Sequence, residues 1–236
     1  MTSDRRRVAG TRRAWVLLGA LALALPLHAQ VAPTEAEKAA YAGLLAAAAK
    51  GDVTQIRALT AKGQNPDVRD ARARTPLHVA AYGDHHEAMR ALVTAGANPN
   101  ALDADRYDIV TIAAVVDHVP TLKVALAVGC SAKNVTSRYD GTALIAAAHL
   151  GHAEVVRTLI RAGAPLNHVN NLGWTALIEA IVLGDGDARH TDTVKALVEA
   201  GANVNLADRS GQSPLTLARA RGYREMVKIL ERAGGR

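Results

Sequence analysis

The sequence predicts an all-α fold, a solenoid of six helix-turn-helix repeats. One recurring position begins a helix, and it advances down the chain in steps of 33, 33, 34, 33 and 38 residues. It is occupied in turn by Ala42, Thr75, Asp108, Thr142, Thr175 and Ser213. A second recurring position ends a helix and is always glycine, at Gly63, Gly96, Gly129, Gly163, Gly201 and Gly234.

The composition is the third observation, and it favours helices over strands. Hydrophobic residues make up 49% of the chain, but aromatic residues only 3%, and there is no Phe. A sandwich or barrel would favour β-branched and aromatic residues. One first-helix position is instead always small, so that helices of neighbouring repeats can approach closely. It holds Ala80, Ala113, Ala147, Ala180 and Ala218.

The segment from Thr142 to Asn167 shows how each repeat is expected to form. Thr142 can cap a short first helix by accepting a backbone N–H from its first turn. Gly151 should stop that helix, because glycine adopts positive φ without a Cβ clash. A second helix is predicted over 152–162 and ends at Gly163. One such unit cannot bury its apolar face alone, so neighbouring repeats must stack around a continuous core.

The second repeat carries the residues of a known family. It contains Thr75-Pro76-Leu77-His78, then apolar residues at helical spacing, and then Gly96. With a period near 33, this segment resembles the ankyrin-repeat family. The resemblance covers the chain from about residue 35 to the C-terminus. It implies β-turn or hairpin fingers between repeats, and partner proteins held by those fingers and by the inner face of the first helices.

The first and last repeats are expected to act as caps of the stack. Residues 30–34 form a short tail before a repeat domain over 35–236. Thr34 and Glu37 have capping-box spacing and should begin a helix that runs unbroken to Lys50. The last second helix is charged, as the end of a solenoid requires. Its charged residues are Arg224, Glu225, Lys228, Glu231 and Arg232.

Three departures from the repeat are visible. The third repeat is the weakest match, and Pro120 falls in the first turn of its second helix, where proline is tolerated. One extra residue lengthens the turn between Asn134 and Gly141. Five extra residues fall within 184–191, between the two helices of the fifth repeat.

Residues 1–29 are predicted to be an export signal. Basic residues precede an apolar run over 14–27, and Ala29 suits the position before a cleavage site. Arg12-Arg13 also resembles a twin-arginine signal. We favour the general secretory route and a periplasmic or secreted protein, with an uncleaved anchor as the alternative. No membrane segment then remains after cleavage, and a monomer is expected.

The remaining charge argues against nucleic acid as a partner. The first 29 residues hold five arginines against Asp4, so +4 of the formal net charge of +6 lies there and +2 remains. No basic stripe interleaved with aromatic residues is present.

The single cysteine, Cys130, is expected to be a small buried residue, with a redox-active or intermolecular thiol as the alternative.

No motif of an enzyme is found: neither a nucleophile elbow, a P-loop nor a Cys/His zinc pattern occurs. The protein is therefore expected not to be an enzyme and to need no cofactor. His86, His118 and His152 are assigned to one framework position at the start of second helices. A metal-dependent or hydrolytic activity in the 184–192 insertion is the rival hypothesis, although the pattern lacks a closing glutamate. Its candidate ligands are Asp185, Asp187, His190 and Asp192.

The predicted partner-binding site lies on the concave face. Tyr, Trp and Arg most often dominate interface energetics, and several occur in the turns before each first helix or late in the first helices. The predicted site residues are Arg72, Arg74, Tyr82, Arg106, Tyr107, Arg138, Tyr139, His149, Leu172, Trp174 and Leu183. The sequence thus predicts a non-catalytic scaffold that binds a partner protein in the periplasm. A secreted effector that acts on another cell is the alternative.

Overall fold

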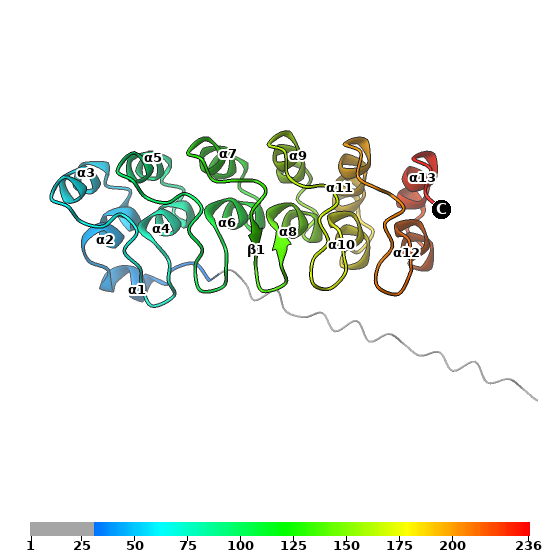
Figure 1. Cartoon of the computed structure of the whole chain (residues 1–236), viewed down its shortest axis with the longest axis horizontal. Coiled ribbons are helices and arrows are strands. Elements are labelled where there is room, and N and C mark those ends of the chain that lie inside the picture. Colours follow the sequence, from blue (N-terminus) through cyan, green and yellow to red (C-terminus); the bar gives the residue numbers. More distant parts are fainter. Residues whose placement is uncertain (1–30) are drawn as a thin grey trace, which may run out of the picture.

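Two parallel rows of short helices run the length of the computed structural model, which describes residues 31–236 (Figure 1). The first helices of the six repeats are α2 (Gly43–Lys50), α4 (Pro76–Tyr82), α6 (Ile109–Val115), α8 (Ala143–His149), α10 (Ala176–Val182) and α12 (Pro214–Ala220). The second helices are α3 (Val53–Ala61), α5 (His86–Thr94), α7 (Val119–Ala127), α9 (Ala153–Arg161), α11 (Ala188–Glu199) and α13 (Arg224–Arg232). The predicted solenoid of six repeats is confirmed.

The predicted helix starts are confirmed at all six positions. Ala42, Thr75, Asp108, Thr142, Thr175 and Ser213 are the N-caps of the first helices. The Asp108 carboxylate, for example, accepts the backbone N–H of Thr111 at 2.7 Å. Because each helix is short, such a cap satisfies a sizeable share of its otherwise unpaired amides.

The six repeat-ending glycines all adopt the left-handed backbone conformation, with φ between +79° and +100°. This conformation costs a residue with a Cβ roughly 1–2 kcal/mol. We therefore expect Gly163→Val to lower the free energy of unfolding by about that amount. A Cβ at this position would meet only Lys133 Cε at 3.7 Å, an ordinary contact, so backbone strain is the whole cost.

Denaturant unfolding measures this effect, with Ala162→Val as the matched control. Ala162 is the neighbouring residue, is exposed and has φ −83°, so its replacement needs no strained backbone. Equal stabilities of the two variants would show that the left-handed turn at Gly163 is not what ends the repeat.

Fingers connect the repeats below the row of first helices (Figure 1). In four of them, the first residue donates its backbone N–H to the carbonyl of the fifth: Asp70 to Arg74, Asp103 to Tyr107, Asn170 to Trp174 and Asp208 to Gln212, each at 3.0 Å. The finger with the extra residue forms a small antiparallel ladder of β1 (Val135–Thr136) and β2 (Gly141–Thr142). The predicted turns and hairpin are thus confirmed.

The first repeat differs from the prediction of one long helix. The capping box is present, since Thr34 Oγ1 accepts from Glu37 N and Glu37 Oε2 accepts from Thr34 N. It begins a separate helix, however, α1 (Glu35–Ala40), and the chain is extended at Tyr41 and Ala42. The Tyr41 hydroxyl donates to Asp70 at 2.6 Å, and Ala42 is the N-cap of α2. Docking α1 on the first finger therefore outweighs continuing the helix.

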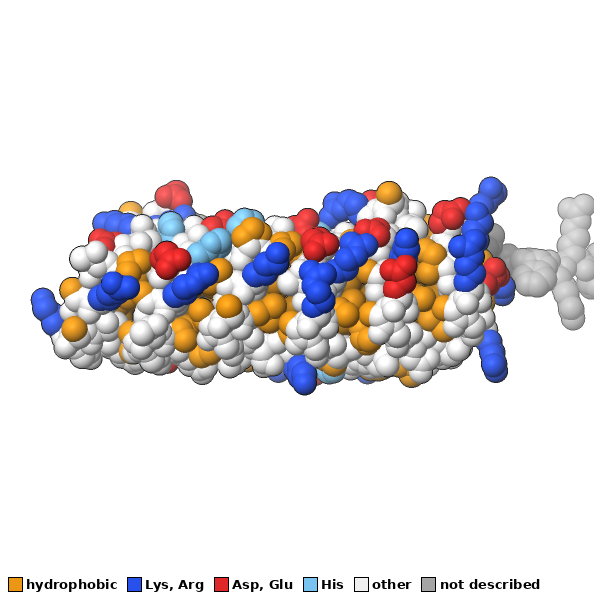
Figure 2. All heavy atoms as spheres, turned by 90° about the horizontal axis from the view of Figure 1, so that it is seen from above, with side chains coloured by type: hydrophobic (Ala, Val, Ile, Leu, Met, Phe, Trp, Pro, Cys, Tyr) orange, Lys and Arg blue, Asp and Glu red, His pale blue; other side chains and the backbone are white. Residues whose placement is uncertain are grey.

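The core lies between the two rows of helices. The constant alanines of the first helices are each 0% exposed. Outside this core, the face over the second helices carries Lys and Arg side chains interspersed with Asp and Glu, with hydrophobic side chains in the furrows between repeats (Figure 2). Within 31–236 no helix has the length and apolar character that crossing a bilayer would need. The predicted export signal lies outside the described residues.

Candidate functional site

A pocket of about 150 Å³ opens between three fingers and three first helices, α6, α8 and α10. The fingers span residues 103–107, 135–142 and 170–174. The pocket is lined by Tyr107, Thr111, Thr136, Ser137, Tyr139, Gly141, Thr142, Ile145, Ala146, His149, Asn170, Leu172, Trp174, Glu179 and Leu183. We call it the groove pocket. Its walls come from the third, fourth and fifth repeats, so only the stacked solenoid can form it.

Six of the eleven predicted site residues meet in this pocket: Tyr107, Tyr139, His149, Leu172, Trp174 and Leu183. Tyr139, His149, Leu172, Trp174 and Leu183 are half-buried, with part of each side chain accessible. Tyr107 is only 6% exposed and belongs to the core. It therefore forms part of the pocket wall and of the core, so replacing it would also disturb packing, whereas we predicted a partner-binding residue displayed on the concave face.

The floor of the groove pocket holds a hydrogen-bonded carboxylate. Glu179 on α10 has a side chain that is 5% exposed. Its Oε2 lies 3.1 Å from His149 Nδ1, and its Oε1 accepts from Asn170 Nδ2 at 2.8 Å. Asn170 also shapes its own finger, since its Oδ1 accepts the backbone N–H groups of Leu172 and Trp174. The network thus connects the finger to the pocket floor.

Glu179 is not among the predicted site residues, although its position in the repeat is unusual. The same first-helix position holds Ala46, Val79, Ile112, Ala146 and Leu217 in the other repeats. A carboxylate is thus placed where the other five repeats are apolar. Burying a charge is costly unless it is paired, so this exception marks a position with a specific role.

Arg74 is the clearest correction to the predicted site. Its side chain is 1% exposed rather than displayed on the concave face. The guanidinium donates to Asp70 Oδ2 and Glu37 Oε1, each at 2.7 Å, and to the Val31 carbonyl at 2.9 Å. The segment that contains α1 covers it, so Arg74 joins the N-terminal segment to the first finger and is not available to a partner.

The other predicted residues lie outside the groove pocket. Arg106 and Arg138 are about half exposed and bridge neighbouring fingers, Arg106 to Asp140 at 3.1 Å and Arg138 to Asp105 at 2.9 Å. Arg72 is exposed on the first finger, over 70–74. Tyr82 is half-buried at the end of α4, and its hydroxyl has no hydrogen-bond partner within the described residues. None of these four residues lines the groove pocket.

The framework histidines also need a correction. We predicted that His86 shares a position with His118 and His152, but the N-caps of α5, α7 and α9 are His85, His118 and His152. The ring of His85 donates from Nε2 to the Ala49 carbonyl of the preceding repeat at 3.1 Å. The histidine at this N-cap position therefore connects successive repeats. His86 is the residue after it and does not belong to the repeat framework.

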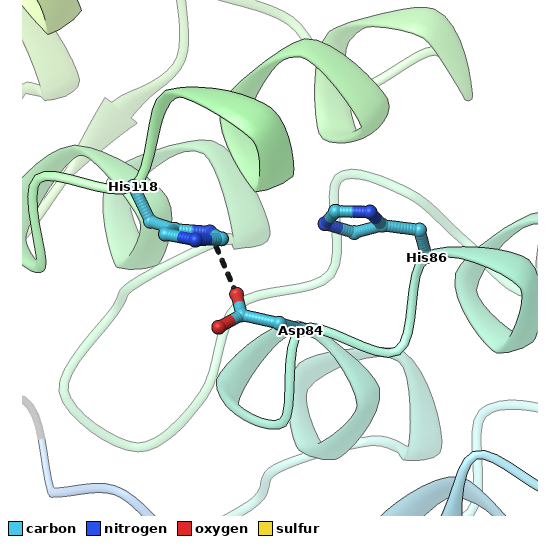
Figure 3. A group of neighbouring side chains, drawn as sticks. All are labelled: Asp84, His86 and His118. Atoms are coloured by element: carbon cyan, nitrogen blue, oxygen red, sulfur yellow. Dashed lines mark ion pairs between the residues drawn. The ribbon is translucent and has the colours of Figure 1, made fainter.

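His86 belongs to a cluster with Asp84 and His118 whose ligand atoms lie within 4.8 Å of one another (Figure 3). Such a set could hold a divalent cation. The buried hydroxyl of Thr121, however, lies 2.6 Å from Asp84 Oδ1 and 2.8 Å from a ring nitrogen of each histidine. Asp84 Oδ1 and His118 Nδ1 are also 2.8 Å apart. These polar atoms therefore satisfy one another as a hydrogen-bonded link between α5 and α7.

The insertion brings together three of its four candidate ligands: Asp185, Asp187 and His190. Asp187 caps α11 by accepting the backbone N–H of His190, whose Nε2 donates to a carbonyl of the preceding repeat at 3.1 Å. Asp192 points elsewhere and pairs with Arg157 at 2.5 Å. The four-ligand set of the rival hypothesis is therefore not assembled, and His190 has the same linking role as His85.

Cys130 is buried, with 3% of its surface exposed. Burial raises the pKa of its thiol, which suppresses the reactive thiolate. The expectation of a small buried residue is confirmed.

Comparisons with known proteins agree with this architecture. Models of ankyrin repeats match residues 44–133, 110–208 and 186–231. The chain is 35% identical over 102 residues to the ankyrin repeat protein YahD of Escherichia coli (strain K12); the match covers 43% of this chain and about half, 51%, of that protein.

Solved structures give the same result over most of the chain. An ankyrin repeat domain from Acinetobacter baumannii AYE superposes with a TM-score of 0.76 at 45% identity, covering 82% of this chain and 98% of that one. The ankyrin repeat domain of Bcl-3, a member of the IkappaB protein family, gives a TM-score of 0.74 at 29% identity and covers 84% and 88%. Together with the six stacked repeats, these matches show that the chain belongs to the ankyrin-repeat family.

Proposed function

We propose that this protein is a periplasmic, non-catalytic scaffold that binds a partner protein through the groove pocket. Ankyrin repeats are protein-protein interaction modules, and the fold is generally a non-catalytic one. The observation that supports the pocket as the docking point is that the predicted site residues come together there. Six residues chosen for their type and repeat position, from three repeats, line one cavity that is open to solvent.

The mechanism is rigid presentation of a preformed surface. The fingers that carry Tyr139 and Trp174 are held by hydrogen bonds across their tips and between neighbours, such as Asn171 N to Tyr139 O at 2.9 Å. A surface that is already ordered loses little conformational entropy on binding, so a few aromatic anchors can supply the affinity.

The proposal is tested by affinity capture from a periplasmic extract with the double variant Tyr139→Ala, Trp174→Ala. We expect at least about a tenfold loss of the captured partner, since truncating two such anchors removes at least 1.4 kcal/mol of binding energy. Tyr107 is left intact because it is part of the core.

The matched control is Val116→Ala with Val169→Ala. Both valines are exposed, at 55% and 48%, and neither lines the pocket. Undiminished capture by the aromatic double variant, with its melting temperature near that of the wild type, would rule out the groove pocket as the docking point.

Export is proposed from the basic start, the apolar run over 14–27 and Ala29 of the sequence. Cell fractionation tests it. Protein found in the periplasmic fraction supports the scaffold that we propose. Protein found chiefly in the medium would favour the effector alternative, and protein retained in the cytoplasm would remove both. Sedimentation of the purified protein tests the proposed monomer.

A further inference from the structure

The buried carboxylate in the groove pocket lacks a permanent counter-charge. Within residues 31–236, the only ion-pair partner of Glu179 is His149, and no Lys or Arg lies within 4.0 Å of it. An imidazole is charged only when it holds two ring protons. When His149 is neutral, it can satisfy a hydrogen bond of the carboxylate but not its charge. A buried carboxylate without a cation is unfavourable, and this raises the gain from a guest that brings one.

The carboxylate also has unused acceptor capacity. An ionised Glu has about four lone-pair sites on its two oxygens. Asn170 and His149 occupy one site on each oxygen. A guanidinium or ammonium group in the pocket could therefore donate to Glu179 without breaking the bonds that position it.

The walls of the pocket suit the same kind of guest. Tyr107, Tyr139 and Trp174 line the same pocket as Glu179. Aromatic faces attract cations through their quadrupole, and the attraction is larger where water is excluded. The remaining wall is largely apolar, from Leu172 and Leu183, and can cover the methylene stem of a long basic side chain.

The size of the pocket limits the guest to about one side chain. Its volume of about 150 Å³ is well below the several hundred Å³ of sites that enclose drug-sized ligands. Together with the proposed protein partner, on which this inference rests, the size favours one residue projecting from a partner loop.

We propose that the groove pocket receives a single arginine or lysine side chain of the partner, which pairs with Glu179 and packs against Trp174 and Tyr139. An arginine can donate two parallel hydrogen bonds to one carboxylate while its planar group stacks on an aromatic ring, so it exploits both features of the pocket. Neutral and acidic side chains lack one or both of these interactions.

The test uses Trp174 as its own reporter. The chain has two tryptophans, Trp15 and Trp174, so the full chain carrying Trp15→Phe reports on the pocket alone. The probes are acetylated, amidated pentapeptides Gly-Ser-X-Ser-Gly in which X is arginine, lysine, citrulline or glutamate. We expect a saturable fluorescence change with arginine and lysine, and binding weaker by at least about tenfold with citrulline, which keeps the shape but not the charge.

A second arm replaces the carboxylate. Glu179→Gln keeps the size of the side chain and its contacts to Asn170, and it should weaken the arginine peptide by about tenfold or more. Asp105→Asn is the matched control, because Asp105 is a neighbouring acid that pairs with Arg138 outside the pocket; it should change binding less than twofold. If Glu179→Gln does not fold, the comparison of arginine with citrulline on the unaltered pocket still decides.

Three results would overturn the inference: equal binding of the arginine and citrulline peptides, no saturable binding of either basic peptide, or an unchanged arginine affinity in folded Glu179→Gln. Capture of the natural partner distinguishes a failure of the basic-anchor inference from a failure of the proposed scaffold function. Capture that depends on Tyr139 and Trp174 but not on Glu179 would leave the scaffold proposal standing and remove only the basic anchor.

Discussion

Arg74→Ala is expected to lower the free energy of unfolding by about 3–5 kcal/mol, the cost of removing one partner from a buried ion pair. Arg74 is 1% exposed and lies between Asp70, Glu37 and the Val31 carbonyl. Removing it leaves the Asp70 carboxylate, itself only 6% exposed, without its cation. It also removes two contacts that hold the N-terminal segment on the first finger.

Arg106→Ala is the matched control for this prediction. Arg106 lies on the next finger and pairs with Asp140 at 3.1 Å, but both side chains are about half exposed. A solvent-exposed pair contributes about 0–1 kcal/mol. Denaturant unfolding of both variants measures the contrast. A loss below about 1 kcal/mol for Arg74→Ala would contradict the buried role assigned here.

The difference in unfolding free energy between the wild type and Arg74→Ala should depend on pH. Burial tends to raise the pKa of Asp70, but hydrogen bonds from Tyr41 and Arg74 outweigh it, and the pKa lies below its ordinary value. A lowered carboxyl pKa stabilises the fold above the unfolded value, about 4, and this stabilisation is lost as the pH falls through the folded value. The stability gap between wild type and Arg74→Ala should therefore be full near pH 7 and shrink below about pH 4.

Ala147→Leu is expected to have the second large effect, a loss of up to about 3 kcal/mol from overpacking. Ala147 is 0% exposed on α8, which packs against α6, α9 and α10. The extra carbons of leucine have no free space there and must push neighbouring helices apart. For a domain of this size, such a loss lowers the midpoint of thermal unfolding by about 6–12 °C.

Ala127→Leu controls for the change of residue type, because Ala127 is exposed at the end of α7. It should leave the melting temperature nearly unchanged, within about 0.5 kcal/mol of the wild type. Similar melting temperatures for the two variants would show that close helix packing is not the reason for alanine at this position.

The sequence predicted the repeat architecture because the signals involved are local. A capping side chain such as Thr142 and a glycine such as Gly163 act on the helix ends beside them, so their residue types report the ends directly. Because the period is nearly constant, the helix ends identified in one repeat predict the helix ends in the next. For the same reason, six of the predicted site residues could be placed on one surface from the register alone.

Contacts between segments distant in the sequence decided which of the predicted residues are buried and where the first helix ends. Arg74 and Tyr107 have the residue types of interface anchors, yet the N-terminal segment contacts and covers Arg74, and Tyr107 is buried in the hydrophobic core. Glu37 and Tyr41 break the expected opening helix by bonding to residues 37 and 29 positions away, respectively. Their exposure depends on the flanking chain, which the repeat pattern does not describe.

By itself, then, the sequence determined the number of repeats, the ends of their helices and the face on which Tyr139 and Trp174 lie. Only the tertiary structure decided that Arg74 is a buried structural residue and that Glu179 forms the floor of a pocket. The physical reason is that period and caps fix the position of a residue within its own repeat. Its burial, charge partners and access to a guest depend on which neighbouring segment packs against it.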